Sequence, residues 1–169
     1  MNISNGKVGM VMSQNVVHVE FKNNDDVIVA QALAILKRRL QAGVGVCLDS
    51  ASSVGDYLAL KIASEKRERF IALYLDKNHK LIDEEVIAIG TVDNVAVSPR
   101  NVAAGALKHE AVGVIVAHNH PSGNAQFSAL DKELTEKIKN CLDVCGINLV
   151  DHVLIAGDKV VSMRSEGMF

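Results

Sequence analysis

The sequence is poor in aromatic residues, lacks tryptophan and has no long apolar run. Its three cysteines, Cys47, Cys141 and Cys145, are an odd number without the spacing of a disulfide framework, as is typical of proteins from reducing compartments. No segment approaches the roughly 18 consecutive apolar residues of a transmembrane helix, and the N-terminus lacks the continuous apolar core of a signal peptide. These absences predict a soluble, cytoplasmic protein without a membrane span.

An excess of charge of one sign is also missing, because 18 lysines and arginines are balanced by 20 aspartates and glutamates, for a formal net charge of −2. This balance gives no general attraction to nucleic acids or anionic membranes. One basic cluster, SEKRERF at Ser64–Phe70, interleaves glutamates with its basic residues and predicts a solvated helix end. Apolar residues reach 49 %, which suits a buried α/β core in a chain of 169 residues.

The first fifty residues predict a small N-terminal extension that precedes the main domain. The expected elements are a short strand at Val16–Phe21, a helix at Asp25–Gln41 and, after a break at Gly43–Gly45, a helix from Ser52 or Ser53 to about Ala63. Apolar residues recur at helical spacing in the first helix, and basic residues lie near its end. We therefore expect an extension over residues 1–50 and a single domain over residues 51–169.

The remaining chain alternates strands and helices. The expected elements are a hairpin of strands at Phe70–Leu75 and Lys80–Thr91, a helix from Ser98 to about Glu110, a buried strand at Val112–His118, a helix at Ala129–Cys145, and strands at Ile147–Ala156 and Val160–Met163. This order predicts an α/β fold in which helices flank a mixed β-sheet.

The stretch AHNHPSGNAQFSALD, residues 117–131, combines residues that are typical of a metal site. Side chains two apart on a strand point the same way, so His118 and His120 are expected to project together where the strand ends. Ser128 occupies a helix N-cap position, and Asp131 follows three residues later in the first helical turn. Two imidazoles and one carboxylate with an open fourth position are typical of catalytic zinc, which lowers the pKa of its bound water and makes it a nucleophile.

The spacing His118-x-His120-x7-Ser128-x2-Asp131 resembles the metalloprotease motif of the JAB/MPN (JAMM) superfamily. The string HNHPSG, followed by VDHVLI at Val150–Ile155, is similar to the RadC-like branch of that superfamily. HNH nucleases share the letters H-N-H, but they spread these residues over a ββα unit instead of placing them side by side.

The resemblance covers about residues 52–169, in the same order of elements. Gly90-Thr91 and Ser98-Pro99-Arg100 are also similar to the RadC-like pattern, with Asn101 where an acidic residue is commoner. The first fifty residues do not resemble the helix-hairpin-helix segment of longer family members. We therefore expect a short, stand-alone form, to which a DNA-binding role of that segment does not transfer.

The resemblance implies a cytidine-deaminase-like fold and a role for each residue of the motif. His118, His120 and Asp131 would bind zinc, which is preferred over iron or manganese since two imidazoles and one carboxylate suit it. Ser128 would stabilise the oxyanion of a tetrahedral intermediate. One further glutamate, upstream of the two histidines, would act as the general base.

Three glutamates compete for the role of general base. Glu68 is favoured, because it lies two residues before the Phe70 strand, where JAMM proteins place this residue. Glu65 is expected about one helical turn earlier on the same side. Glu85, in the second strand of the hairpin, is the serious alternative.

Other residues of metal-binding types lie outside the motif. Asp151 and His152 could hydrogen-bond a ligand histidine, or they could form a structural pair near the site. Cys141 and Cys145, four residues apart, could share a helix face and bind a metal, but we expect them to be core residues. The remaining histidines are expected in a strand, a turn and a helix end: His18, His79 and His109.

Two hypotheses for function follow. The first is a zinc-dependent hydrolase that cleaves a peptide or isopeptide amide bond in a protein or peptide substrate. The second is an accessory or binding module in DNA repair or a mobile element, since fold alone does not fix function. The intact ligand set favours the first, the near-neutral charge counts against direct nucleic-acid contact, and edge strands leave a homodimer open.

Overall fold

A computed structural model describes residues 24–42, 51–90 and 97–168 of the chain. The helices in these ranges are α1 (Asn24–Ala42), α2 (Ala51–Ile62), α3 (Pro99–Lys108) and α4 (Ala129–Val144). The strands are β1 (Arg69–Leu75), β2 (Leu81–Ile89), β3 (Gly113–Asn119), β4 (Asn148–Ala156) and β5 (Lys159–Ser162). The strand predicted at Val16–Phe21 and the break predicted at Gly43–Gly45 lie outside the described residues.

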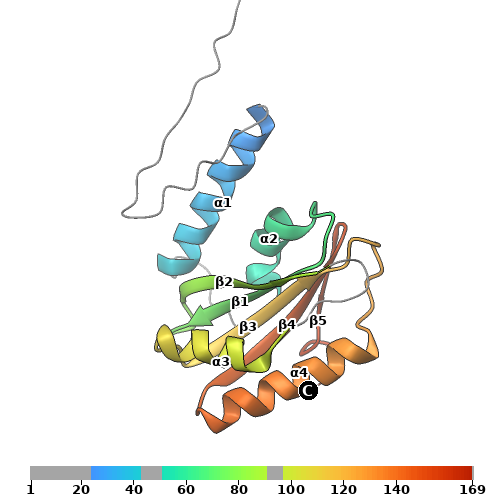
Figure 1. The fold of residues 1–169 in the computed structure, drawn as a ribbon. Coiled ribbons are helices and arrows are strands. Elements are labelled where there is room, and N and C mark those ends of the chain that lie inside the picture. The colour runs from blue at the N-terminus through green and yellow to red at the C-terminus, as the bar shows by residue number, and fades with distance from the viewer. Residues whose placement is uncertain (1–23, 43–50, 91–96, 169) are drawn as a thin grey trace, which may run out of the picture.

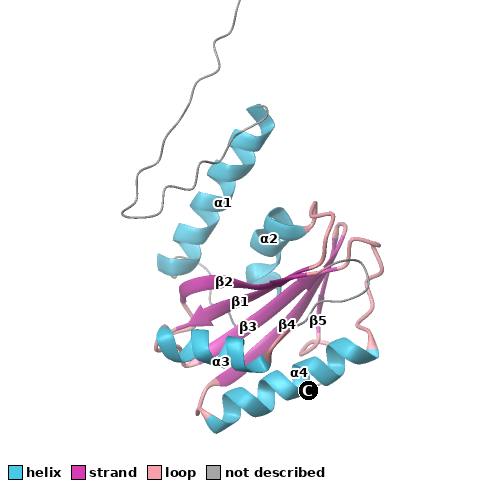
Figure 2. Cartoon of the chain, viewed as in Figure 1, coloured by secondary structure: helices cyan, strands magenta, loops and turns pink. Residues whose placement is uncertain are grey.

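The five strands form one mixed sheet in the order β2-β1-β3-β4-β5 (Figure 1). Strands β3 and β4 run parallel and are connected through α4, whereas the other neighbouring strands are antiparallel. Helices α1 and α2 cover one face of the sheet, and α3 and α4 cover the other (Figure 2). The predicted fold class, a mixed sheet flanked by helices, is confirmed.

Strand β3 lies at the centre of the sheet and is buried along its whole length, because helices cover both of its faces. Ile115 and Ala117 belong to the core under α1 and α2, whereas Val114 and Val116 belong to the core under α3 and α4. This alternation places His118, two residues after Val116, on the α3–α4 face of the sheet.

The segment predicted as a helix end, Ser64–Phe70, is instead a loop followed by the start of β1, since α2 ends at Ile62. The physical reason lies on β3, fifty residues later in the chain. The Asn119 amide donates to Glu65 O at 3.2 Å and to Arg67 O at 3.3 Å, and its Oδ1 accepts from Arg69 N at 2.7 Å. These contacts use the backbone groups that a longer helix would need for its own hydrogen bonds.

The two described cysteines differ from each other. Cys141 is partly buried and packs against the α3–α4 core, whereas Cys145 is exposed at the C-cap of α4. The expectation of a core residue was therefore wrong for Cys145. Among the helices of the described ranges, none combines the length and the apolar character that a bilayer crossing needs.

Candidate metal centre

The two motif histidines lie at the end of β3. His118 is the penultimate residue of the strand, and His120 directly follows its last residue, Asn119. His120 N still donates to Ile155 O of β4 at 2.8 Å, which keeps the chain extended through both histidines. The two side chains meet as the spacing predicts, with their Nε2 atoms 3.1 Å apart.

Asp131 approaches the histidines from the first turn of α4. A capping box holds it there: Ser128 Oγ accepts from Asp131 N at 3.1 Å, and Asp131 Oδ2 accepts from Ser128 N at 2.7 Å. The carboxylate then has Oδ1 3.4 Å from His118 Nε2 and Oδ2 3.7 Å from His120 Nε2. The same short motif therefore starts the helix and delivers a carboxylate to the histidines.

Glu68 completes the group from the loop between α2 and β1. One candidate ligand atom from each of Glu68, His118, His120 and Asp131 lies within 4.8 Å of the others. We call these four residues the acceptor cluster. Asn119 and Gly90 hold the loop in place: the Asn119 side chain makes three hydrogen bonds to its backbone, and Gly90 N donates to Glu68 O at 2.9 Å.

The lone pairs of the acceptor cluster converge, and among the described residues no lysine or arginine forms an ion pair with its side chains. His120 Nδ1 lies 2.8 Å from Asn124 O, and a carbonyl can only accept, so Nδ1 carries a proton; in the neutral form of this ring the inward Nε2 is then unprotonated. Burial lowers the pKa of His118 to about 4, so this imidazole is neutral near pH 7. Two imidazole nitrogens together with carboxylate oxygens are a set of metal ligands that fits zinc.

The Glu68 carboxyl differs from an ordinary surface glutamate. Its partial burial raises its pKa above the usual value, the positive form of His120 opposes this rise, and the negative charge of Asp131 adds to it. A carboxylate with a raised pKa holds a proton more readily than a free glutamate does. Such a group next to a metal site is suited to accept and return a proton.

A family model described as the RadC-like JAB domain matches residues 48–168, a range that contains the whole acceptor cluster. The chain belongs to the RadC-like JAB domain family. It is 41 % identical over 120 residues to a UPF0758 protein of Pseudoalteromonas translucida, a match that covers 71 % of this chain and 54 % of the relative. A UPF0758 protein of Burkholderia cenocepacia is 44 % identical over 120 residues, or 71 % of this chain and 47 % of the relative.

These matches span about half the length of the two relatives. The UPF0758 protein YfjY of Escherichia coli is 36 % identical over 140 residues, which cover 83 % of this chain and 87 % of the relative. The names of these relatives give a family and no activity. Membership in the RadC-like JAB domain family therefore supports the fold and a metal site, and the reaction has to be argued from the residues.

Glu85, the alternative general base, lies outside the acceptor cluster of this JAB domain. Its Oε1 accepts from Lys108 Nζ at 2.7 Å and from His109 Nε2 at 3.1 Å, and its Oε2 accepts from the Tyr74 hydroxyl at 3.3 Å. We call Tyr74, Glu85, Lys108 and His109 the Glu85 cluster. The hydrogen bonds from Lys108 and His109 hold the pKa of Glu85 below its usual range.

Glu65 and Ser128 also have defined partners. Glu65 lies in the loop, not one helical turn before Glu68, and its Oε1 is 3.1 Å from Arg69 Nη2. The Ser128 hydroxyl donates to Asp131 Oδ2 at 2.7 Å while it accepts from Asp131 N. The structure thus shows Ser128 as a helix cap beside the acceptor cluster, and its role toward an oxyanion stays a prediction.

Sequence reasoning left open the role of His152 and overlooked Thr135. His152 Nε2 lies 2.8 Å from His118 Nδ1, and its Nδ1 lies 2.5 Å from Thr135 Oγ1. Asp151 instead accepts from Ser162 Oγ at 2.6 Å and from two backbone amides, so it is structural. The signal for Thr135 was its position four residues after Asp131, on the same face of α4.

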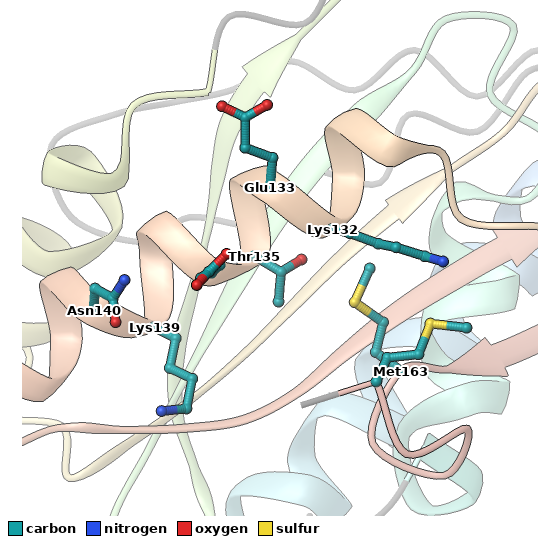
Figure 3. A pocket seen from close by; sticks show the side chains of 8 residues that line it. Lys132, Glu133, Thr135, Lys139, Asn140 and Met163 are labelled. Carbon is teal, nitrogen blue, oxygen red and sulfur yellow. The ribbon is translucent and has the colours of Figure 1, made fainter.

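A surface pocket lies between α4 and the C-terminal turn (Figure 3). Its lining carries charges of both signs and two methionines: Lys132, Glu133, Thr135, Glu136, Lys139, Asn140, Met163 and Met168. None of the acceptor cluster lines it. Mixed charge without a converging set of polar groups assigns this pocket no ligand.

Proposed function

We propose that this JAB domain is a zinc-dependent hydrolase of the JAMM type that cleaves a peptide or isopeptide amide bond. One observation carries the proposal: four side chains that accept hydrogen bonds or bind metals converge within 4.8 Å, and two of them are imidazoles with inward lone pairs. A purely structural polar cluster would pair each acceptor with a donor. A convergent set of acceptors is instead stabilised by a cation.

Each residue of the cluster has a separate task in the proposal. His118, His120 and Asp131 would hold the zinc, which supplies Lewis acidity and activates water at neutral pH. Glu68 would take the proton of the attacking water and deliver it to the leaving amine. Ser128 Oγ, beside Asp131, would stabilise charge on the oxygen of the attacked carbonyl.

The proposed substrate is a peptide or protein in the cytoplasm, a location that the cysteine content favours. Direct nucleic-acid binding is not part of the proposal, because the net charge of −2 provides no general attraction to phosphate. A role as an accessory module would leave the convergent acceptors without a purpose.

The test combines metal content with peptide cleavage on the full chain. The purified protein is stripped with a chelator, reloaded with zinc, and analysed for bound metal and for cleavage of mixed linear and lysine-linked isopeptides by mass spectrometry. We expect about one zinc per chain, as a single three-ligand site predicts. His120→Ala is expected to lose the metal together with cleavage.

Two glutamate variants form the matched comparison. Glu68→Gln is expected to keep the zinc and to lose cleavage by about 10²–10⁴-fold, the usual contribution of a general base. Glu85→Gln makes the same chemical change outside the cluster and is expected to keep both the zinc and the cleavage of the wild type. A wild-type chain that stays metal-free in excess zinc would overturn the proposal and favour the accessory module.

A further inference from the structure

A continuous chain of hydrogen bonds leads away from the acceptor cluster into the protein. It starts at His118 Nδ1, which is 2.8 Å from His152 Nε2, and continues from His152 Nδ1 to Thr135 Oγ1 at 2.5 Å. Thr135 Oγ1 in turn lies 2.6 Å from Asp131 O. The chain therefore connects the side chain of one proposed zinc ligand with the backbone of another.

The direction of every proton in this chain follows from its last contact. Asp131 O is a carbonyl and can only accept, so the single hydroxyl proton of Thr135 is donated to it. Thr135 Oγ1 must then accept the proton of His152 Nδ1. If Thr135 donated its proton to His152 Nδ1 instead, no proton would lie between Thr135 Oγ1 and Asp131 O, which are 2.6 Å apart.

The same logic fixes the protonation of His118. Because neutral His152 carries its proton on Nδ1, its Nε2 is an acceptor, and His118 must donate from Nδ1. Neutral His118 then has an unprotonated Nε2, and this is the atom that lies 3.1 Å from His120 Nε2 in the acceptor cluster. The opposite tautomer would point an N–H group at the place where a metal binds.

We propose that Thr135 and His152 are positioning residues that hold His118 in the tautomer whose Nε2 is free to bind a metal. This inference rests on the proposed metal site but not on the proposed hydrolysis. Neither residue touches the cluster's centre, and both act through His118. Partners of this kind typically change metal affinity by about 10–100-fold when they are removed.

A β-bulge in β4 brings His152 beside His118. The pairing of β3 with β4 shifts register between Val114 and Ile115, whose partners are Leu149 and Asp151, so Val150 is an extra residue in β4. Such a bulge reverses the facing of the residues that follow it. His152 thereby joins the α3–α4 face, where its direct partner is Val116, two residues before His118.

Asp151 and two phenylalanines stabilise this arrangement. The buried Asp151 carboxylate accepts from His152 N at 2.7 Å and from Arg164 N at 3.1 Å, which satisfies backbone donors beside the bulge. The His118 ring stacks on Phe70, with centroids 6.0 Å apart and an interplanar angle of 13°, and packs against Phe127 at 5.9 Å. A ring enclosed in this way cannot swap its two nitrogens without moving its neighbours.

The first test needs neither a variant nor a metal. Histidine side-chain nitrogens of the metal-free, ¹⁵N-labelled full chain are assigned by long-range ¹H–¹⁵N correlation spectra near neutral pH. We expect both His118 and His152 to carry the proton on Nδ1 alone. A spectrum in which His118 is protonated on Nε2 overturns the inference, whatever the chain hydrolyses.

The second test compares two substitutions of Thr135 by competition with a zinc-binding dye. Thr135→Val keeps the shape but removes the hydroxyl, so His152 loses the acceptor that fixes its proton; we expect mixed tautomers at His118 and about 10–100-fold weaker zinc binding. Thr135→Ser keeps the hydroxyl and should bind zinc within about threefold of the wild type. A folded Thr135→Val chain with wild-type tautomers and affinity refutes the role, and if this variant fails to fold, the wild-type spectrum decides.

The two proposals fail in different ways. If the wild type binds no zinc but shows the expected tautomers, the proposed function falls and the hydrogen-bond chain stands. If zinc binds equally well with and without the Thr135 hydroxyl, the positioning role falls and the metal site stands.

Discussion

Two clusters of glutamate and histidine lie on the same face of the sheet and differ in the number of their hydrogen-bond donors. Phe70 packs against His118 of the acceptor cluster at the start of β1, and Tyr74 stacks on His109 of the Glu85 cluster near the end of that strand, with ring centroids 4.9 Å apart. In the Glu85 cluster, a lysine, a histidine and a tyrosine donate to both carboxylate oxygens. In the acceptor cluster, when both imidazoles are neutral and carry their protons on Nδ1, the nitrogens and oxygens that approach one another all carry lone pairs.

This difference explains why the two glutamates have opposite pKa shifts. Donors lower the pKa of Glu85, whereas burial without a matching donor raises the pKa of Glu68. Residue types alone would not separate the two groups. The balance of hydrogen-bond donors and acceptors favours the acceptor cluster as the group that could bind a metal.

The largest expected effect is stabilisation by zinc, because the ion would satisfy the whole acceptor cluster at once. At a free zinc concentration of about 1,000 times Kd, linkage predicts a gain of about 4 kcal/mol, or roughly 8–16 °C in Tm for a chain of this size. Thermal unfolding with zinc and with a chelator measures the gain. Glu85→Gln should retain it and His120→Ala should lose it; an equal gain in His120→Ala would place the zinc elsewhere.

The next effect concerns the loop that carries Glu68, which depends on one buried side chain. Asn119→Ala removes all three hydrogen bonds between that side chain and the loop backbone. Because Arg69 N loses a buried partner, we expect a loss of about 3 kcal/mol in the free energy of unfolding, measured in urea. Asn124→Ala makes the same change at an exposed position and should stay within about 0.5 kcal/mol; equal losses in both would contradict the anchoring role.

The contacts of Asn119 also show what the sequence could and could not predict. The alternation of apolar residues gave the strands and helices, and the motif identified three members of the acceptor cluster, because both signals are local. The end of α2 was predicted to within a residue, but the loop at residues 64–68 could not be predicted from its own residues, since the Asn119 side chain that binds its backbone is more than fifty positions away. The extra residue Val150 in β4 could not be predicted either, because a bulge is defined by the pairing with the partner strand. The approach of His152 to His118 depends on this bulge and was therefore not predicted.

A substitution in α3 tests whether the Glu85 cluster is structural. Gly→Ala within a helix usually stabilises by about 0.5–1 kcal/mol, but a Cβ at Gly105 would overlap the Tyr74 hydroxyl and lie 2.9 Å from Glu85 Oε2. We expect Gly105→Ala to destabilise by about 2 kcal/mol, within the usual cost of overpacking, without changing zinc affinity. Adding Tyr74→Phe removes the overlapping oxygen and should restore part of the loss; a stabilising Gly105→Ala would show that Tyr74 can move freely.

The smallest effect is the pH dependence of stability, where the two glutamates should have opposite signs. The folded pKa of Glu85 is lowered, so its contribution to stability is complete above the unfolded value of about 4.3 and is lost as the pH falls through the folded pKa. The folded pKa of Glu68 is raised, so its carboxylate costs stability above that pKa, and the cost disappears as the pH falls toward about 4.3. In urea unfolding of the metal-free protein, Glu68→Gln should therefore be more stable than the wild type near pH 7 and Glu85→Gln less stable, with both differences shrinking toward pH 3. Differences of the same sign would mean that the acceptor cluster already holds enough positive charge of its own, and the argument for a bound cation would lose its electrostatic basis.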